Sequence, residues 1–136
     1  MARYLLDASA IYPLVLKLRE KLLEYADRLA VLDLTVYEVG NAIWKEARRG
    51  RIRSPTIAAK LFEEIFKSLT ILKLGAHLRE ALELAITESL TFYDAAYLYA
   101  ARVHGLKLVT EDRDLLRFPE ALNTDTLIRE LEAPTR

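Results

Sequence analysis

The chain has 136 residues with 20 basic and 20 acidic side chains and no cysteine, so its length fits one domain and its formal net charge is zero. The absence of cysteine excludes disulfides, a thiol nucleophile and a zinc–thiolate site, and the neutral charge means that any attraction for nucleic acid must be local. The start has too short an apolar stretch for a signal peptide, and no run approaches the ~18 apolar residues of a membrane helix, so we expect a cytoplasmic protein with no membrane contact.

Short apolar segments alternate with helical patterns along the whole chain. In chain order we expect a strand at 3–7, a helix at 10–30 interrupted by Pro13, a strand at 31–34, helices at 35–49 and 54–69, a strand at 70–74, helices at 76–89 and 91–104, a strand at 107–110 and a helical turn at 112–116. The tail from Asn123 has no clear pattern. Strands separated by helices predict an α/β fold, in which a parallel sheet carries helices on both faces.

Acidic residues stand at four places where an expected strand ends or an expected helix begins. Asp7 and Asp112 follow the first and last strands, and Glu38 and Asp94 lie in the first turns of the helices at 35–49 and 91–104. In an open α/β sheet, ligands bind at the carboxyl ends of the strands. Because Mg²⁺ takes oxygen ligands, four carboxylates that converge there would form a metal site.

Each acid also has a purely structural interpretation. Asp7 suits a helix cap or turn, and Glu38 suits a capping box with Thr35 on a solvent-facing side of its helix. Asp94 suits a capping box with Thr91, but its helix is apolar almost all round. Such a helix is usually buried, and a buried charge must be paired or bind a metal, so the metal interpretation is stronger for Asp94.

The remaining patterns leave one choice open and exclude other chemistry. Periodicity does not choose between Asp112 and Asp114 for the acid that faces the crevice. The two histidines, His77 and His104, lie on separate expected helices, where surface or helix-end roles suit them. The four glycines are scattered, so there is no glycine-rich phosphate loop.

Four segments, in this order, resemble the PIN-domain family and most closely its VapC-type toxins. They are Leu6-Asp7-Ala8-Ser9-Ala10, Thr35-x-x-Glu38-x-x-Asn41, Tyr93-Asp94-Ala95-Ala96-Tyr97 and Leu108-Val109-Thr110-x-Asp112. The resemblance covers essentially all of residues 1–136 and is weakest after Leu116. It implies a single PIN-like domain, an α/β/α sandwich with a mostly parallel central sheet.

The resemblance also implies a function and the residues that carry it. The function is that of a Mg²⁺- or Mn²⁺-dependent endoribonuclease, the toxin component of a VapBC-type toxin–antitoxin system. The family's acidic quartet falls on Asp7, Glu38, Asp94 and Asp112, as catalytic residues and metal ligands. The polar residues around it fall on Ser9, Asn41 and Thr110, with Asp114 as an auxiliary acid. Candidate RNA contacts are Lys45, Arg48, Arg49 and Arg51, from the densest basic cluster in the chain.

Two other functions stay open. One is a catalytically inactive PIN fold that binds RNA or serves as a scaffold, and an intact quartet argues against it. The other is a different metal-dependent phosphohydrolase, such as a small phosphatase. Such phosphatases place a second aspartate two residues after the first, where this chain has Ser9.

Partners are expected on two grounds. The resemblance implies RNA as substrate, a cognate antitoxin as inhibitor and a homodimer. In addition, the helices at 10–30 and 54–69 carry more apolar residues than one packed face obviously uses, and monomers rarely expose large apolar patches. The alternative is that these two helices pack on each other and on the sheet.

Overall fold

A five-stranded parallel sheet in the order β3-β2-β1-β4-β5 forms the middle layer of the computed structural model, which describes residues 1–134. The strands are β1 (Tyr4–Leu6), β2 (Leu29–Leu32), β3 (Thr70–Leu72), β4 (Lys107–Val109) and β5 (Ala121–Leu122). The helices are α1 (Ala8–Leu18), the 3₁₀ segment η1 (Arg19–Arg28), α2 (Asp33–Arg48), α3 (Pro55–Ser68), α4 (Leu78–Glu88), α5 (Phe92–His104), α6 (Arg113–Leu116) and α7 (Thr124–Glu132). The expected parallel sheet is confirmed.

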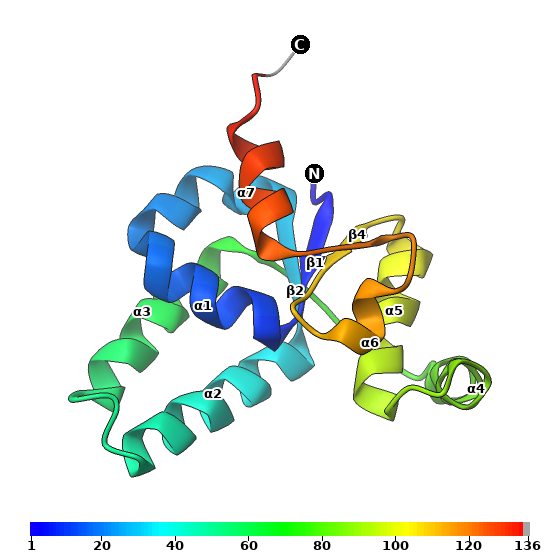
Figure 1. The fold of residues 1–136 in the computed structure, drawn as a ribbon, viewed down its shortest axis with the longest axis horizontal. Helices are drawn as coiled ribbons and strands as arrows, with labels where there is room; N and C mark the ends of the chain where they lie inside the picture. The colour runs from blue at the N-terminus through cyan, green and yellow to red at the C-terminus, as the bar shows by residue number, and fades with distance from the viewer. Residues whose placement is uncertain (135–136) are drawn as a thin grey trace.

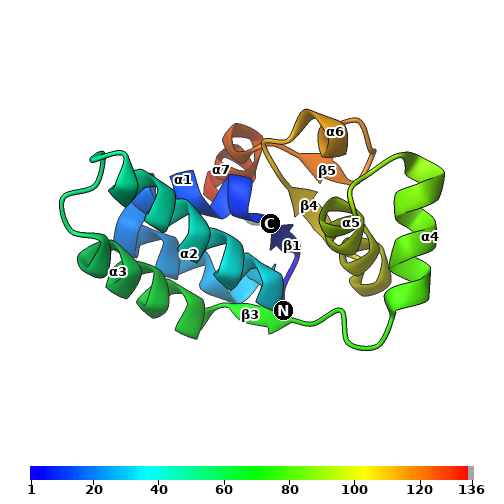
Figure 2. The ribbon, with the colours of Figure 1, turned by 90° about the horizontal axis from the view of Figure 1, so that it is seen from below.

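The two faces of the sheet are covered by different helices, as Figures 1 and 2 show. Successive strand residues point to opposite faces, so a continuous apolar strand fills two cores at once. Leu6, Val31 and Val109 join the core with α1, η1, α3 and α7, whereas Leu5, Leu32 and Leu108 join the core with α5 and α6. The expected α/β/α sandwich is therefore confirmed.

The sheet reverses its direction of growth at β1. The chain runs from β1 to β2 and β3 on one side, and then crosses back to place β4 and β5 on the other side. At such a topological switch point the connections leave β1 and β4 in opposite directions, and a crevice opens outside their carboxyl ends. Asp7 directly follows β1, and Asp112 is the third residue after the end of β4.

The start of α2 differs from the sequence prediction. The strand lies at Leu29–Leu32 rather than at 31–34, and the helix begins at Asp33. Thr35 is thus inside the first turn, fully buried, and its hydroxyl accepts a hydrogen bond from the amide of Leu32 at 3.0 Å. The predicted capping box between Thr35 and Glu38 is wrong, because Thr35 caps backward onto the strand and Glu38 bonds elsewhere.

The chain after Leu116 also gains a definite structure. Ala121–Leu122 adds a parallel edge strand to β4, and the side chain of Asn123 accepts a hydrogen bond from the amide of Thr126 to open α7. The hydroxyl of Tyr4 donates to Glu130 at 2.7 Å, which ties α7 to β1. Short pairing over two residues leaves little period-2 pattern, so this strand was not recognisable from sequence.

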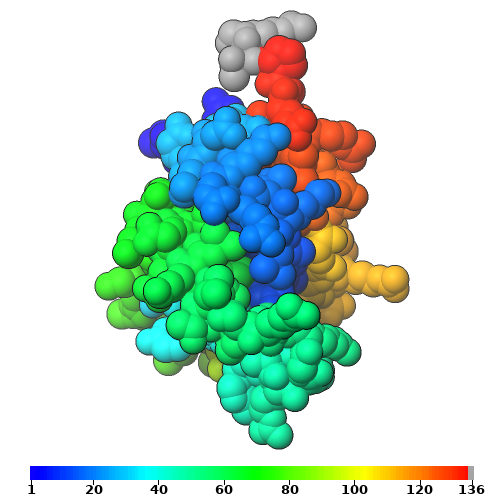
Figure 3. Space-filling view, turned by 90° about the vertical axis from the view of Figure 1, so that its left-hand side faces the viewer, coloured from blue at the N-terminus to red at the C-terminus, as the bar shows by residue number. Residues whose placement is uncertain are grey.

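Most of the apolar residues that suggested a partner surface are core residues instead. The predicted helix at 10–30 divides into α1 and η1 at Arg19, whose φ is 50°. Figure 3 shows η1 in blue lying against α3 in green. Buried members of the two segments are Leu14, Val15, Leu22, Phe62, Ile65, Phe66 and Leu69, and exposed ones are Leu16, Leu23 and Ile57. The alternative interpretation, mutual packing, accounts for most of this surface.

Exposed apolar side chains gather on a different helix. On α4, Leu78, Leu82 and Ile86 are 61%, 46% and 73% exposed, and their four-residue spacing places them along one side of the helix.

Within residues 1–134 no helix has the length and apolar character needed to cross a membrane.

Candidate active site

Two buried hydroxyl groups join the ends of β1 and β4 around Asp7. The carboxylate of Asp7 accepts hydrogen bonds from Ser9 Oγ at 2.7 Å and from Thr110 Oγ1 at 2.6 Å. Ser9 Oγ in turn accepts from the amide of Glu111 at 2.9 Å, and Thr110 Oγ1 accepts from the amide of Asp112 at 3.0 Å. The structure thus places Ser9 and Thr110, two of the polar residues singled out from the sequence, in contact with the first acid.

Three acids from α5 and α6 form the densest group of carboxylates. Asp94, Asp112 and Asp114 each offer one oxygen, and these oxygens all lie within 4.8 Å of one another. Asp94 stands in the first turn of α5 behind the cap of Thr91, and Asp112 caps α6 by accepting from the amide of Asp114 at 2.9 Å. The choice between Asp112 and Asp114 thus has a structural answer, since both face Asp94.

Glu38 is held by a chain of buried hydroxyl groups that the sequence did not reveal. Tyr97 donates its hydroxyl proton to Glu38 Oε1 at 2.6 Å. The hydroxyl of Thr35 lies 2.7 Å from the hydroxyl oxygen of Tyr97 and must therefore donate to it. Tyr97 is only 2% exposed. Burial, followed by the bond to Glu38, raises the pKa of Tyr97 far above its usual value, so it remains a proton donor.

The sequence signals for Tyr97 were its place at the end of the family-like segment Tyr93-Asp94-Ala95-Ala96-Tyr97 and its position three residues after Asp94 on an almost wholly apolar helix. This spacing puts the two side chains on one side of α5. A tyrosine in such a helix is interpreted as a core residue. Periodicity does not show that its hydroxyl meets a carboxylate from α2.

Crowding and burial make two of the acids difficult to ionise. Burial raises the pKa of Asp7 to about 6, in spite of its hydroxyl and amide donors, and the charge of Glu38 adds to the effect. Burial also raises the pKa of Asp94 to about 6, with further contributions from Asp112 and Asp7. These mutual effects link the acids from four elements into one electrostatic site.

No basic side chain of residues 1–134 forms an ion pair with the site acids. The eight ion pairs in this part of the chain involve other carboxylates. Among them, Arg102, the only basic residue near Asp94 in sequence, pairs with Glu120 at 2.8 Å. The site therefore offers concentrated negative charge and only oxygen donors, which fits a hard divalent cation such as Mg²⁺ or Mn²⁺.

The basic residues at the end of α2 and just after it have different surroundings. Lys45 lines a pocket with Glu38 and Asn41. The guanidinium of Arg48 lies 5.2 Å from the ring centre of Trp44. Arg49 and Arg51 lie 3.8 Å and 3.4 Å from the carboxylate of Glu46.

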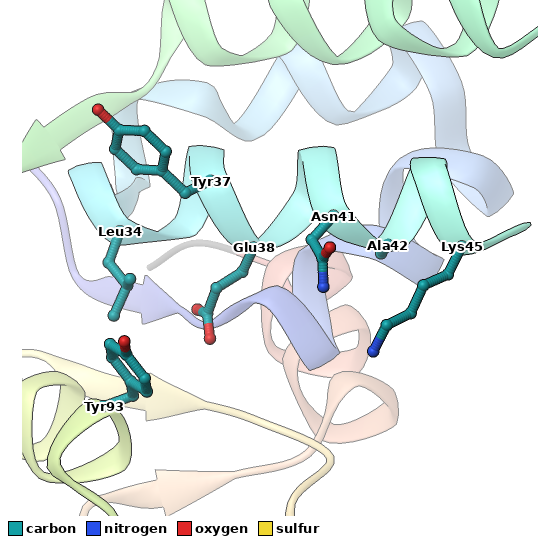
Figure 4. Close-up of a pocket in the computed structure, with 7 residues that line it drawn as sticks. All are labelled: Leu34, Tyr37, Glu38, Asn41, Ala42, Lys45 and Tyr93. Carbon is teal, nitrogen blue, oxygen red and sulfur yellow. The ribbon is translucent and has the colours of Figure 1, made fainter.

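The pocket runs along α2 and has a volume of about 470 Å³. It is lined by Leu34, Tyr37, Glu38, Asn41, Ala42, Lys45 and Tyr93. Figure 4 shows Glu38, Asn41 and Lys45 projecting from the same side of α2, with Tyr93 of α5 lying across from Leu34. One wall of the acidic site is therefore also one wall of an open, partly aromatic pocket.

A three-layer sandwich with carboxylates gathered at its strand ends is the arrangement of a PIN fold. The PIN domain family matches residues 4–121, so the chain belongs to this family. Two curated relatives come from Pyrobaculum aerophilum. "Exonuclease VapC9" is 43% identical and aligns over 96% of both chains, and "Ribonuclease VapC3" is 39% identical over 86% of this chain and 95% of its own.

Solved structures agree with this assignment. The crystal structure of PAE2754 from the same organism has 42% identity and a TM-score of 0.89, and it covers 98% of this chain and 91% of its own. A DNA-bound VapBC from Salmonella typhimurium has 18% identity and a TM-score of 0.66 over 91% and 99% of the two chains, which is a similarity of fold alone.

The raised pKa of Asp94 predicts a pH-dependent gain from Asp94→Asn. Its folded pKa of about 6 exceeds the ordinary 3.8, so folding favours the neutral acid and metal-free stability falls as pH rises between those values. In EDTA at pH 7 the variant should melt about 2–5 °C above the parent, and the gain should vanish near pH 4. Melting curves at both pH values measure this. Asp125→Asn, in the first turn of α7, is the matched control and should show no such dependence.

An equal gain at pH 4 and pH 7 would contradict the role of charge at Asp94. Asp7→Asn is a poorer test of repulsion, because both oxygens of Asp7 accept hydroxyl hydrogen bonds that an amide cannot reproduce.

The contact of Tyr97 with Glu38 predicts that Tyr97→Phe impairs the site while keeping the core packed. Loss of the hydrogen bond from Tyr97 to Glu38 should lower the affinity of the site for Mn²⁺, or the rate of nuclease cleavage, by about 10- to 100-fold. Calorimetric Mn²⁺ titration gives a readout that does not depend on activity. Tyr99→Phe is the matched control, since Tyr99 lies on the same helix as Tyr97 and its hydroxyl donates to Glu80 of α4 at 3.0 Å, outside the site. Equal effects of the two variants would show that Tyr97 has only a structural role.

Proposed function

We propose that this chain is the toxin nuclease of a VapBC-type toxin–antitoxin pair, and that it hydrolyses RNA phosphodiester bonds with Mg²⁺ or Mn²⁺. The observation that carries the proposal is the group of three carboxylate oxygens within 4.8 Å, without a basic partner among residues 1–134. Membership of the PIN family and the VapC names of its relatives support the same reaction class.

The metal would be held by Asp94, Asp112 and Asp114, with Asp7 or Glu38 completing the site. A bound divalent ion lowers the pKa of a coordinated water and stabilises charge on a phosphate. Its binding would also relieve the repulsion that raises the pKa of Asp7 and Asp94. The donor set is entirely oxygen, in keeping with such an ion.

The protein's own groups orient the reactants. Asp7 is fixed by Ser9 and Thr110, so its oxygens face a constant direction. Glu38 is fixed through one oxygen by Tyr97, which leaves the other oxygen available to ligate or to position the attacking water. The basic residues Lys45, Arg48, Arg49 and Arg51 remain the candidate RNA contacts, and of these Lys45 lines the same pocket as Glu38.

The mode of cleavage is the finer part of the proposal. One relative is named an exonuclease and the other a ribonuclease. We propose endonucleolytic cleavage of RNA, because Glu38, one of the four acids, lines an open pocket rather than an enclosed cavity that would select a chain end.

Two sets of substrates test this function. Purified protein with Mg²⁺ or Mn²⁺ should cut linear and circular single-stranded RNA, EDTA should stop the reaction, and Asp7→Asn should lower the rate by at least about 100-fold. Gel analysis of both RNA forms measures the products. Cleavage of linear RNA with circular RNA untouched would indicate an exonuclease, and preference for DNA would refute RNA as substrate.

The same assay separates the other two functions. RNA binding without cleavage in any divalent metal would favour an inactive binding module. Hydrolysis of small phosphomonoesters with RNA intact would favour a phosphatase, although the residue two after Asp7 is Ser9 rather than aspartate.

Partners form the last part of the proposal. An antitoxin that places an Arg or Lys among the acids would pair with them and compete with the metal, which offers a physical means of inhibition. Self-association has apolar surface available on α4, where Leu78, Leu82 and Ile86 are exposed.

Mass measurements test both partners. Light scattering at micromolar concentration should give a dimer mass for the isolated chain, and Leu82→Glu should give a monomer because it puts a charge in the apolar row. Glu83→Gln, on the same helix but outside the apolar row, is the control and should stay dimeric. A monomer mass for the parent would refute the dimer. Purification from the native source should recover a short partner that suppresses cleavage, and a chain isolated alone and fully active would refute the antitoxin.

A further inference from the structure

Two polar side chains of the pocket along α2, those of Lys45 and Asn41, are not used by the fold. Lys45 makes no ion pair and Asn41 no side-chain hydrogen bond with any residue in the part of the chain that the structure describes. Both are exposed, and both stand on the side of α2 that carries Glu38. An ammonium and a carboxamide left available beside a carboxylate site suit a ligand with a phosphate and hydrogen-bonding groups.

An exposed aromatic ring forms the opposite wall. Tyr93 directly precedes Asp94 and is 59% exposed, although the rest of its helix is largely buried. Figure 4 shows its ring across from Leu34, so the two make an apolar surface beside the carboxylate of Glu38. Exposed aromatic rings are the usual platforms on which single-stranded bases stack.

Glu38, Asn41 and Lys45 form a row along α2 that is long enough for a strand of nucleic acid rather than for one phosphate. Glu38 and Lys45 are seven residues apart in sequence, which is roughly 10 Å along a helix axis. A phosphate held at the acids is therefore not the natural partner of Lys45, which is placed for a neighbouring phosphate. The pocket volume, about 470 Å³, is that of a small-ligand site (about 300–1,000 Å³).

We propose that this pocket is a subsite for one nucleotide of single-stranded RNA next to the cleaved bond. Tyr93 stacks on the base, Asn41 hydrogen-bonds to the base edge, and Lys45 pairs with the adjacent phosphate. The proposal rests on the proposed nuclease function, and it names the feature of the RNA that the site binds. A base in a duplex is already stacked and paired, so the subsite selects unpaired RNA.

Tyr37 has a different position and is not assigned to the base. It is 78% exposed, and Figure 4 shows its hydroxyl directed away from Glu38, at the rim of the pocket. Tyr93 is therefore the residue on which the test concentrates.

Stacking is tested with an RNA that carries 2-aminopurine, a base whose fluorescence is quenched by stacking. Binding is measured with Ca²⁺ replacing Mg²⁺, under conditions in which the RNA is verified to stay intact. Tyr93→Ala should weaken binding by about 5- to 100-fold and restore fluorescence, whereas Tyr93→Phe should bind like the parent. Val103→Ala is the matched control, because Val103 lies on the same helix with the same 59% exposure.

An abasic RNA locates the base that Tyr93 contacts. Removing that base should weaken binding to the parent about as much as Tyr93→Ala does, and should have little further effect on the variant, since both changes remove one interaction. For the phosphate, Lys45→Ala should reduce the slope of log affinity against log salt by about 0.7, and Lys60→Ala on α3 should leave the slope unchanged.

The outcomes separate this proposal from the nuclease function. If Tyr93→Ala cleaves RNA and binds it like the parent, the subsite is refuted while the nuclease stands. If the parent cleaves nothing but the fluorescence changes at Tyr93 persist, the nuclease is refuted and the subsite holds. If Tyr93→Ala keeps RNA affinity but no longer binds a co-purified short protein, the pocket belongs to that partner and the subsite is refuted.

Discussion

The contact on which the site depends is the hydrogen bond from the buried hydroxyl of Thr110 to Asp7, at 2.6 Å. It joins the end of β4 to the end of β1, at the point where the sheet reverses its direction. The hydroxyl oxygen of Thr110 also accepts a hydrogen bond from the amide of Asp112, so this one hydroxyl sets the positions of two acids, Asp7 and Asp112. Ser9 makes the corresponding bridge between Asp7 and the amide of Glu111, so two hydroxyl groups join the ends of the two strands.

The cost of this arrangement is electrostatic. Carboxylates from β1, α2, α5 and α6 are brought together without a basic side chain to neutralise them, and burial adds to the difficulty of ionising Asp7 and Asp94. Such a group is stable only because the two cores on either side of the sheet supply the free energy that holds the elements in place. A cation at the site would convert this repulsion into binding free energy.

Helix α2 serves the core and the site with different sides. Val39 and Ile43 pack in the core, whereas Glu38, Asn41 and Lys45 face the pocket. The hydroxyl chain from Thr35 through Tyr97 to Glu38 fixes the helix against α5, which carries Asp94 and Tyr93. The separation of α2 and α5 therefore controls both the position of an acid and the width of the pocket.

The sequence by itself determined the layers of the fold, the strand ends at which the acids stand and the four segments that match the PIN family. These features are local, because apolar periodicity and capping residues act within one element. Tertiary structure alone decided that Thr35 caps onto β2, that Asp114 joins Asp94 and Asp112, and that Tyr97 holds Glu38. It also decided that Lys45 lines the pocket with Glu38 while Arg49 and Arg51 lie beside Glu46. The physical reason is that periodicity shows which face of a helix is apolar, but not which other element that face meets.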